Sequence, residues 1–293
     1  MAAPMRILLT GKNGQVGWEL QRTLAILGEV TALDRTGMDL SNPDSIRQAI
    51  RQVKPNLIVN AAAYTAVDKA ESEPDIAMAI NGVAPGIMAE EAMRLGAGII
   101  HYSTDYVFDG TNSSPYIETD IPNPVSVYGK TKLAGEQAIA AVDAPHLIFR
   151  TSWVYGLRGK NFLLTIQRLA NERSELRIVK DQIGAPTWCR TIAEATALVI
   201  ARSQSPFAEM PKEIYNLTSA GAASWFDFAV AILRYSEKSG RQSSPAVVPI
   251  TTSEYPLPAK RPANSTLSVK KFTDAFGFEL PQWERGLALC LDY

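Results

Sequence analysis

The stretch Arg6-Ile-Leu-Leu-Thr10-Gly11-Lys-Asn-Gly14-Gln-Val-Gly17 decides the fold class of this chain. Its first five residues form an apolar run typical of a buried strand, and residues 14–27 have the periodicity of a helix. Glycines at a strand-to-helix turn let the backbone approach a ligand, and the helix N-terminus attracts negative charge. The stretch therefore predicts a turn that binds a dinucleotide diphosphate. The predicted contacts are Gly11, Gly14, Gln15, Val16 and Gly17.

Strands and helices alternate beyond this turn. Four more strands are predicted from short apolar runs, at residues 29–33, 57–60, 97–103 and 147–151. Three helices are predicted between them, at residues 43–53, with Ser41 or Asn42 as N-cap, 75–95, with Gly96 as its stop, and 125–142. Apolar runs without a period of two are typical of parallel strands covered on both faces. Residues 1–152 are thus expected to form an α/β domain, a Rossmann-type doubly wound parallel sheet.

The second half of the chain is less regular. Helices are predicted at residues 162–171, 191–203, 224–239, 267–276 and 282–291. In the third of these, Ser224 is the expected N-cap and Gly240 the expected stop. Residues 241–262, rich in Ser, Pro and Thr, are expected to be irregular. We interpret residues 153–293 mainly as a smaller C-terminal substrate-binding lobe, with some segments returning to the first domain.

The composition excludes several classes of function. A net charge of −1 gives no basic surface for nucleic acid, and 46% hydrophobic residues are ordinary for a globular enzyme. Two distant cysteines, Cys189 and Cys290, and two histidines, His101 and His146, argue against a disulfide framework and a histidine-rich metal site. No apolar stretch reaches the roughly 18 residues that span a bilayer, and the N-terminus lacks a signal-peptide pattern. A cytoplasmic protein without a membrane partner is expected.

Residues after the second and third strands extend the expected cofactor site. Asp34 ends the second strand, where a carboxylate can accept hydrogen bonds from ribose hydroxyls and favour NADH. Arg35 follows at once and can pair with a 2′-phosphate, favouring NADPH. The choice between the two cofactors stays open. The remaining candidates are Asp39 and Leu40 near the adenine, Ala63, Tyr64 and Thr65 after the third strand, and Tyr102 in the fourth.

Tyr128 and Lys132 are the candidate catalytic pair. They stand at i and i+4 and so share one face of a predicted helix. A tyrosine with a pKa near 10 is a poor acid–base group at pH 7, and a nearby ammonium lowers that pKa by stabilising the phenolate. Thr104 follows the fourth strand, where its hydroxyl can bond a substrate carbonyl. The three residues together predict reduction of a ketone.

The motifs resemble those of the extended short-chain dehydrogenases, and in detail the dTDP-4-dehydrorhamnose reductase family. The strings that carry the resemblance are Gly11-Lys-Asn-Gly-Gln-Val-Gly-Trp-Glu-Leu20, Asn60-Ala-Ala-Ala-Tyr-Thr-Ala-Val-Asp-Lys-Ala-Glu71, Ser103-Thr-Asp-Tyr-Val-Phe-Asp-Gly110, Val127-Tyr-Gly-Lys-Thr-Lys-Leu-Ala-Gly-Glu136, Phe149-Arg-Thr-Ser-Trp-Val-Tyr155, Asp181-Gln-Ile-Gly-Ala-Pro-Thr187 and Arg261-Pro-Ala-Asn-Ser265. They extend over nearly the whole chain.

The resemblance implies a reaction and a set of roles. A 4-ketosugar nucleotide, dTDP-4-dehydro-6-deoxy-L-mannose, would be reduced to dTDP-L-rhamnose by NADPH or NADH. Tyr128 would protonate the C4 oxygen, Lys132 would adjust Tyr128 and bind the ribose, and Thr104 would orient the carbonyl. The residues that would line the substrate site with Thr104 are Val67, Asp105, Tyr106 and Trp153. Mg²⁺ is implied by the resemblance alone, and no ligands are assigned to it.

Arg261 is a further candidate, for contact with the substrate diphosphate, because guanidinium matches phosphate with two hydrogen bonds. A solvated loop charge is its alternative role.

Several alternatives remain. Related dehydratases carry Asp-Glu after the active-site Thr, whereas Asp105 and Tyr106 stand here, which argues against elimination of water. A reductase or epimerase for another nucleotide sugar is still possible. So is a non-catalytic subunit resembling the regulatory partner of methionine adenosyltransferase. The chain is expected to be a monomer or a homodimer.

Overall fold

The computed structural model describes residues 4–203, 211–238 and 245–292. Its centre is a six-stranded parallel sheet with the order β10-β5-β4-β3-β1-β2. The bounds are β1 Arg6–Thr10, β2 Glu29–Leu33, β3 Leu57–Asn60, β4 Gly98–Thr104, β5 His146–Thr151 and β10 Glu213–Asn216. The central strands β3, β4 and β5 are buried along their whole length, which explains their unbroken apolar runs. The predicted α/β class and parallel sheet are confirmed.

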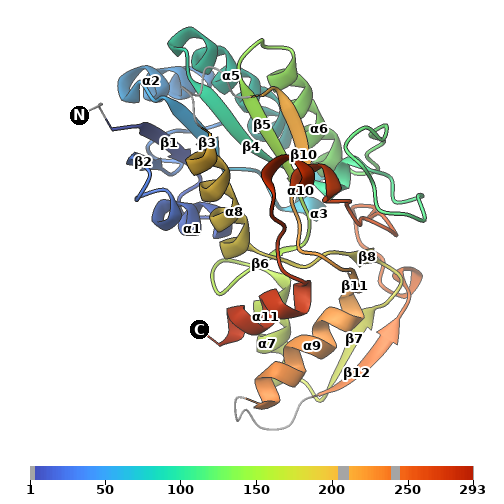
Figure 1. Ribbon diagram of the computed structural model, residues 1–293. Helices are drawn as coiled ribbons and strands as arrows, with labels where there is room; N and C mark the ends of the chain where they lie inside the picture. The colour runs from blue at the N-terminus through green and yellow to red at the C-terminus, as the bar shows by residue number, and fades with distance from the viewer. Residues whose placement is uncertain (1–3, 204–210, 239–244, 293) are drawn as a thin grey trace.

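Helices cover both faces of the sheet (Figure 1). One face carries α2 Pro43–Val53, α5 Ala84–Leu95 and α6 Val127–Ala140. Their core joins Ile46, Ile87 and Ile139 to Leu8 of β1 and Ile58 of β3. The other face carries α1 Gln15–Thr23, α8 Cys189–Arg202 and α10 Lys270–Phe276, whose apolar side chains pack on the alternate residues of the same strands. Successive side chains of a strand point to opposite faces, so two separate cores form.

Three segments from the second half of the chain join this layer structure. The strand β10 pairs in parallel with β5, α8 lies beside α1, and α10 packs its Phe272 against Phe149 of β5. Sequence periodicity cannot reveal such returns, because strand pairing across more than sixty residues leaves no local signal.

The remaining elements form a smaller lobe below the sheet in Figure 1. Its helices are α7 Phe162–Glu172, α9 Trp225–Lys238 and α11 Trp283–Leu291. Its short strands pair as β6 Val154–Tyr155 with β9 Thr187–Trp188, β7 Glu175–Val179 with β12 Ala246–Ile250, and β8 Ile183–Gly184 with β11 Ala223–Ser224. A third core, which includes Tyr155, Phe228 and Trp283, holds the lobe together.

Most predicted helix ends agree with the structure within about two residues. Asn42 caps α2 by accepting from the backbone N–H groups of Asp44 and Ser45. Gly96 ends α5 in the left-handed region, as expected. Ser224 accepts from the N–H of Asp227 at the start of α9. The predicted stop at Gly240 lies outside the described residues.

Three expectations need correction. The first helix ends at Thr23, not residue 27, because the chain turns at residues 24–28 to place Glu29 beside Met5. The predicted helix 75–95 is interrupted by a π-helical turn, Ala79–Val83. Pro85 has no N–H for the carbonyl of Asn81, which explains the interruption.

The third correction concerns residues 241–262, which were expected to be irregular. Residues 246–250 form the strand β12, which pairs with β7, and a short 3₁₀ helix follows at Thr252–Glu254. Pro249 is tolerated because β12 is an edge strand, where a missing N–H donor breaks no ladder.

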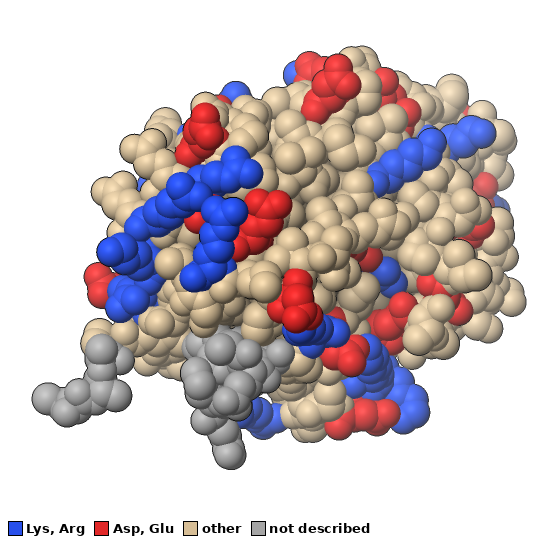
Figure 2. Space-filling view, turned by 90° about the horizontal axis from the view of Figure 1, so that it is seen from above, with Lys and Arg blue, Asp and Glu red and all other residues tan. Residues whose placement is uncertain are grey.

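Charge on the surface is dispersed. Basic and acidic side chains are interspersed on the face seen in Figure 2, consistent with the net charge of −1. Among the described residues, no helix is long and apolar enough to cross a membrane. Cys189 and Cys290 are both free and buried.

A buried ion pair connects α6 to β5 and supports a first prediction. Arg150 donates to both carboxylate oxygens of Glu136, at 3.0 and 2.7 Å, and the two side chains are only 2% and 3% exposed. Glu136→Gln should lower the free energy of unfolding by about 3–5 kcal/mol, because it leaves a buried guanidinium without its counter-charge. Urea unfolding followed by circular dichroism measures this.

Glu172→Gln is the matched control, since Glu172 pairs with Arg168 on the exposed surface of α7. It should cost no more than about 1 kcal/mol. Equal losses in the two variants would contradict the role given to the buried pair.

Candidate active site

The glycine turn between β1 and α1 brings two backbone segments into close contact. Gly11 has φ +70°, and a Cβ there would lie 2.8 Å from the backbone N of Ala62. A Cβ on Gly17 would lie 2.1 Å from the carbonyl oxygen of Gly11. Gly11 therefore allows the turn to pass the end of β3, and Gly17 allows α1 to start directly under the turn.

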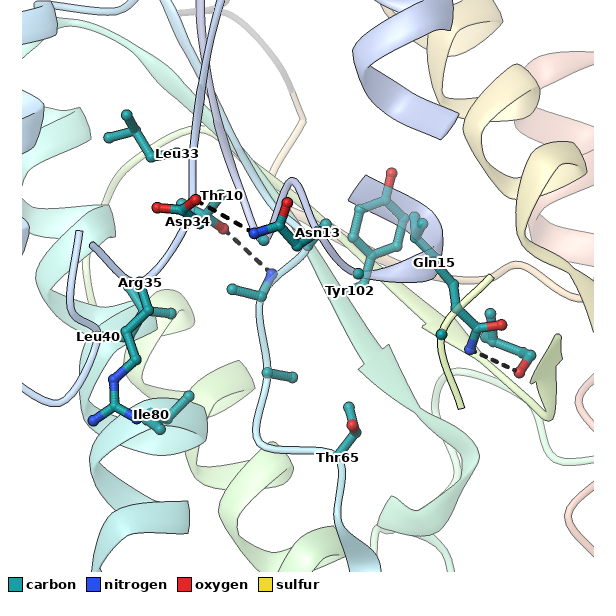
Figure 3. A pocket seen from close by; sticks show the side chains of 18 of the residues that line it. Thr10, Asn13, Gln15, Leu33, Asp34, Arg35, Leu40, Thr65, Ile80 and Tyr102 are labelled. Carbon is teal, nitrogen blue, oxygen red and sulfur yellow. Dashed lines mark hydrogen bonds between the residues drawn. The ribbon is translucent and has the colours of Figure 1, made fainter. Parts of the chain in front are cut away.

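A cavity of about 560 Å³ opens above this turn, at the carboxyl ends of β1, β3, β4 and β5 (Figure 3). The predicted cofactor residues that line it are Gly11, Gly14, Gln15, Val16, Asp34, Arg35, Asp39, Leu40, Ala63, Thr65, Tyr102, Tyr128 and Lys132. Gly17 and Tyr64 do not line it. Gly17 is buried behind Gly11, and the hydroxyl of Tyr64 donates to Glu73 at 2.7 Å.

Asp34 and Arg35 differ in how far their charges are already engaged. Asp34 accepts from Thr36 and Asn13 and pairs with Lys12 at 3.2 Å. The hydrogen bond from Thr36, then that from Lys12, holds the pKa of Asp34 well below its usual range. Arg35 is 79% exposed, reaches Asp39 only at 3.8 Å, and lies beside Leu40 at the cavity wall. The carboxylate is thus held by the protein, whereas the guanidinium remains accessible to a ligand.

Several cavity residues were missed by sequence reasoning. They are Thr10, Asn13, Leu33, Met38, Ile80, Ser103, Thr151, Val154, Gly159 and Lys160. Val154, Gly159 and Lys160 follow β5 and are held over the glycine turn by Asn161, which donates to Gln15 at 2.8 Å. This loop reaches the glycine turn only in the folded protein, so no local sequence pattern could predict its place in the cavity.

Two of the missed residues carry buried hydroxyls that suit a polar ligand. Within the described part of the chain, Ser103 Oγ and Thr151 Oγ1 have no hydrogen-bond partner. Both line the cavity, at the ends of the neighbouring strands β4 and β5. Buried polar atoms are seldom left unpaired, so these hydroxyls fit the polar groups of a bound dinucleotide.

The candidate catalytic residues meet at one end of the cavity. Ser126 caps α6 by accepting from the N–H of Gly129, and this starts the helix so that Tyr128 and Lys132 face β4. Lys132 Nζ donates to the carbonyl oxygen of Tyr102 at 2.6 Å and lies 3.2 Å from His101 Nε2. Its amino group is thus fixed by the backbone of β4.

Burial shifts the pKa values of both candidate catalytic groups in the direction that favours their neutral forms. It raises the pKa of Tyr128 to about 12, although a hydrogen bond with Thr104 opposes the rise. It lowers the pKa of Lys132 to about 8, although Glu136 opposes the fall. The direction for Tyr128 is opposite to that expected from the sequence, because desolvation of the phenolate, with the nearby charge of Asp105, raises the pKa more than the hydrogen bond with Thr104 lowers it.

The candidate substrate residues surround Thr104 at the end of β4. Thr104 donates to Asp105 at 2.9 Å, and Asp105 also accepts from Ser152 at 2.8 Å. Burial raises the pKa of Asp105, and hydroxyl donors oppose the rise. The ring of Tyr106 meets that of Tyr128 edge to face, with centroids 5.6 Å apart.

Arg261, Val67 and Trp153 lie around the same region on separate elements. Arg261 binds both carboxylate oxygens of Asp68, at 3.1 and 2.8 Å, and a hydrogen bond also relates it to Tyr106. Val67 begins the short helix α3, Val67–Ala70, which carries Asp68. Trp153 has φ +45° and stacks on Trp225 of the small lobe, with ring centroids 3.4 Å apart. Arg261 is therefore an engaged, half-buried charge and not a solvated loop charge.

No group of three or more His, Cys, Asp or Glu suited to a metal ion occurs among the described residues.

Comparisons with known proteins match this geometry. Residues 5–293 fit the model of a family described as RmlD substrate binding domain. A dTDP-4-dehydrorhamnose reductase of Burkholderia thailandensis is 50% identical over 98% of both chains, and that of Escherichia coli K12 is 45% identical over 98% of this chain and 97% of its own. The chain belongs to the dTDP-4-dehydrorhamnose reductase family. It is therefore an oxidoreductase of the dTDP-4-dehydrorhamnose reductase type.

Solved structures agree with this assignment. The dTDP-4-dehydrorhamnose reductase of Bacillus anthracis, in complex with NADP, has a TM-score of 0.91 and 33% identity, covering 98% of this chain and 99% of that one. A UDP-glucose 4-epimerase of Thermus thermophilus, at 20% identity and a TM-score of 0.82, shares the fold alone. The reductase family predicted from the motifs is confirmed.

The glycine turn of this family member gives a second prediction. Gly11→Ala should weaken NADP⁺ binding at least tenfold and lower the free energy of unfolding, because its Cβ would overlap backbone atoms of β3 that cannot move independently. Titration followed by protein fluorescence, together with urea unfolding, measures both effects.

Gly96→Ala is the matched control, since Gly96 has φ +64° but nothing within 4 Å of an added Cβ. It should lose only about 1–2 kcal/mol for the left-handed backbone and bind NADP⁺ normally. If both variants bound NADP⁺ like the unmodified protein, the close approach at Gly11 would not matter for the site.

Proposed function

We propose that this chain reduces the 4-keto group of dTDP-4-dehydro-6-deoxy-L-mannose to give dTDP-L-rhamnose, with Tyr128 as the proton donor. The names of the relatives support the substrate. The chemistry is supported by Tyr128 and Lys132, which line the cavity, and by Thr104, which is hydrogen-bonded to Tyr128. A bound NADPH or NADH would supply the hydride to C4. The C4 oxygen would take its proton from the hydroxyl of Tyr128.

The pKa directions suit a reductase. A buried tyrosine with a pKa near 12 keeps its proton at pH 7, which is the form that a proton donor requires. Thr104 would orient the substrate carbonyl beside that hydroxyl. Lys132, held on the carbonyl oxygen of Tyr102 and beside His101, would bind the cofactor ribose with its remaining N–H donor and adjust Tyr128 by its charge.

The small lobe, mainly residues 153–293, would bind the sugar nucleotide together with residues of the first domain. Tyr106 and Asp105 would contact the sugar, and Val67 would line the same side. Trp153, locked against Trp225, would offer a rigid aromatic surface. Arg261 would bind the diphosphate by exchanging one of its bonds to Asp68 for a phosphate oxygen.

NADPH is the cofactor that the charges favour. The accessible guanidinium of Arg35 can pair with a 2′-phosphate, whereas the carboxylate of Asp34 is held by Lys12, Asn13 and Thr36. The NADP complex of the Bacillus anthracis relative supports this choice. A cytoplasmic location, where both small, water-soluble substrates would be found, is part of the proposal, as is a monomeric or homodimeric state.

Replacement of Tyr128 tests the chemistry. Tyr128→Phe should reduce kcat by roughly 10²-fold or more, because the phenyl ring has no proton to give. The loss of NADPH or NADH absorbance with dTDP-4-dehydrorhamnose measures this. Tyr255→Phe is the control, since Tyr255 is 54% exposed and should leave kcat unchanged. If well-folded unmodified protein consumed neither cofactor, the substrate assignment would be wrong.

Replacement of Arg35 tests the cofactor preference. Arg35→Gln should raise KM for NADPH about tenfold, because it removes one exposed contact with the 2′-phosphate. KM for NADH should stay nearly constant, because NADH lacks that phosphate. Arg168→Gln, on the surface of α7, is the control for a lost arginine. An equal change for NADH would show that Arg35 does not contact the 2′-phosphate.

A further inference from the structure

A chain of buried polar side chains leads from Lys132 across three neighbouring strands. Lys132 Nζ lies 3.2 Å from His101 Nε2 of β4, and His101 Nδ1 lies 3.0 Å from Asn60 Nδ2 of β3. Asn60 Oδ1 in turn accepts from Thr10 Oγ1 of β1 at 2.6 Å. The sheet register places Thr10 beside Asn60 and Asn60 beside His101. None of the four residues is more than 2% exposed, so their polar atoms depend on one another for hydrogen bonds.

His101 remains neutral within this chain. Burial, and then the charge of Lys132, holds the pKa of His101 well below its usual value. A neutral imidazole has one N–H donor and one acceptor nitrogen. The state of Lys132 therefore decides which nitrogen of His101 must carry the proton.

Two arrangements give each ring nitrogen of His101 a partner. A charged Lys132 has no lone pair, so His101 must accept a hydrogen bond with Nε2 and carry its own proton on Nδ1. That Nδ1–H group then donates to the side-chain amide oxygen of Asn60. This first arrangement requires the side-chain amide of Asn60 to turn, so that its oxygen gives up the hydrogen bonds from Thr10 and from the N–H of Ala62. A neutral Lys132 can accept from Nε2–H, and the amide nitrogen of Asn60 then donates to Nδ1. The second arrangement is the one in the structure, where Asn60 Nδ2 faces His101 Nδ1.

We propose that His101 is a positioning residue for Lys132. The position of the proton on the neutral ring of His101 changes from one nitrogen to the other whenever Lys132 gains or loses its charge. On loss of the charge, Lys132 gives a proton to Nε2 and the proton on Nδ1 leaves to solvent. The side-chain amide of Asn60 turns over at the same time. The ring thus holds Nζ at β4 in both charge states, and its importance for turnover rests on the proposed function.

Two tyrosines and one buried ion pair surround Lys132. On α6, Tyr128 has a pKa of about 12, and Glu136 is paired with Arg150 of β5. On β4, the hydroxyl of Tyr102 is bonded to Thr196 of α8, and its pKa is raised by burial. Lys132 is therefore the group that titrates near pH 8.

Nitrogen NMR tests the tautomers without substrate or cofactor. The chain has two histidines, so ¹⁵N-histidine labelling gives one site signal and one internal control. His101 should carry its proton on Nδ1 below about pH 7 and on Nε2 above about pH 9, on either side of the Lys132 pKa. His146, whose Nδ1 faces the carbonyl oxygen of Ala144, should keep one tautomer throughout.

Lys132→Met should abolish the tautomer change at His101 and leave His146 unaltered. A single His101 tautomer over the whole range, or a change that persists in Lys132→Met, would overturn the proposal. Either outcome leaves the proposed reductase activity untouched, so the two failures are distinguishable.

Activity at several pH values tests the positioning role. His101→Leu removes an acceptor of the ammonium, so the Lys132 pKa should fall. The basic limb of the kcat profile should then move down by about one pH unit, with kcat near pH 8 falling about fivefold. His101→Gln keeps an acceptor oxygen and should restore most of the profile, and His146→Gln is the matched control. If His101→Leu and His101→Gln lowered kcat equally and left the basic limb of the pH profile in place, His101 would have only a packing role.

Discussion

The parallel alignment of the six strands is the constraint on which the rest of this structure depends. Parallel strands end at a common edge, so the residues that follow β1, β3, β4 and β5 collect around one cavity. Each crossover then places a helix on one face or the other, and the two apolar cores follow from the alternation along the strands. The cavity is thus a consequence of strand direction, and its chemistry depends on which residues stand at the strand ends.

The catalytic end of the cavity is governed by desolvation. Burial raises the pKa of Tyr128 and lowers that of Lys132, because a low-dielectric surrounding disfavours both the phenolate and the ammonium. For the proposed ketone reduction, the first effect would be useful, since it would keep a proton on the hydroxyl of Tyr128. The second makes the charge of Lys132 depend on its acceptors, the carbonyl oxygen of Tyr102 and the ring of His101. Substitutions that alter these partners on β4 are therefore expected to change the charge of Lys132 and, through it, the proposed reaction.

Side-chain bridges connect the small lobe to the glycine turn. Gln15 of α1 donates to the carbonyl oxygen of Val154 and accepts from Asn161, so the loop after β6 is tied to the first turn of α1. Trp153, between the two lobes, has a left-handed backbone and is locked in a stack with Trp225. The cofactor cavity and the candidate substrate residues therefore share one connected set of contacts.

The amino-acid sequence by itself determined the parallel α/β class, the glycine turn and the family, and it suggested the candidate catalytic trio. These features depend on local periodicity and on motifs of a few residues. The tertiary structure alone decided that α8, β10 and α10 return to the sheet, that Pro85 interrupts a helix, and that Ser103, Thr151 and Lys160 line the cavity. It also reversed the expected pKa direction of Tyr128. The pairing of distant segments depends on the whole fold, and so does the burial of each side chain. Neither can be predicted from a short stretch of sequence.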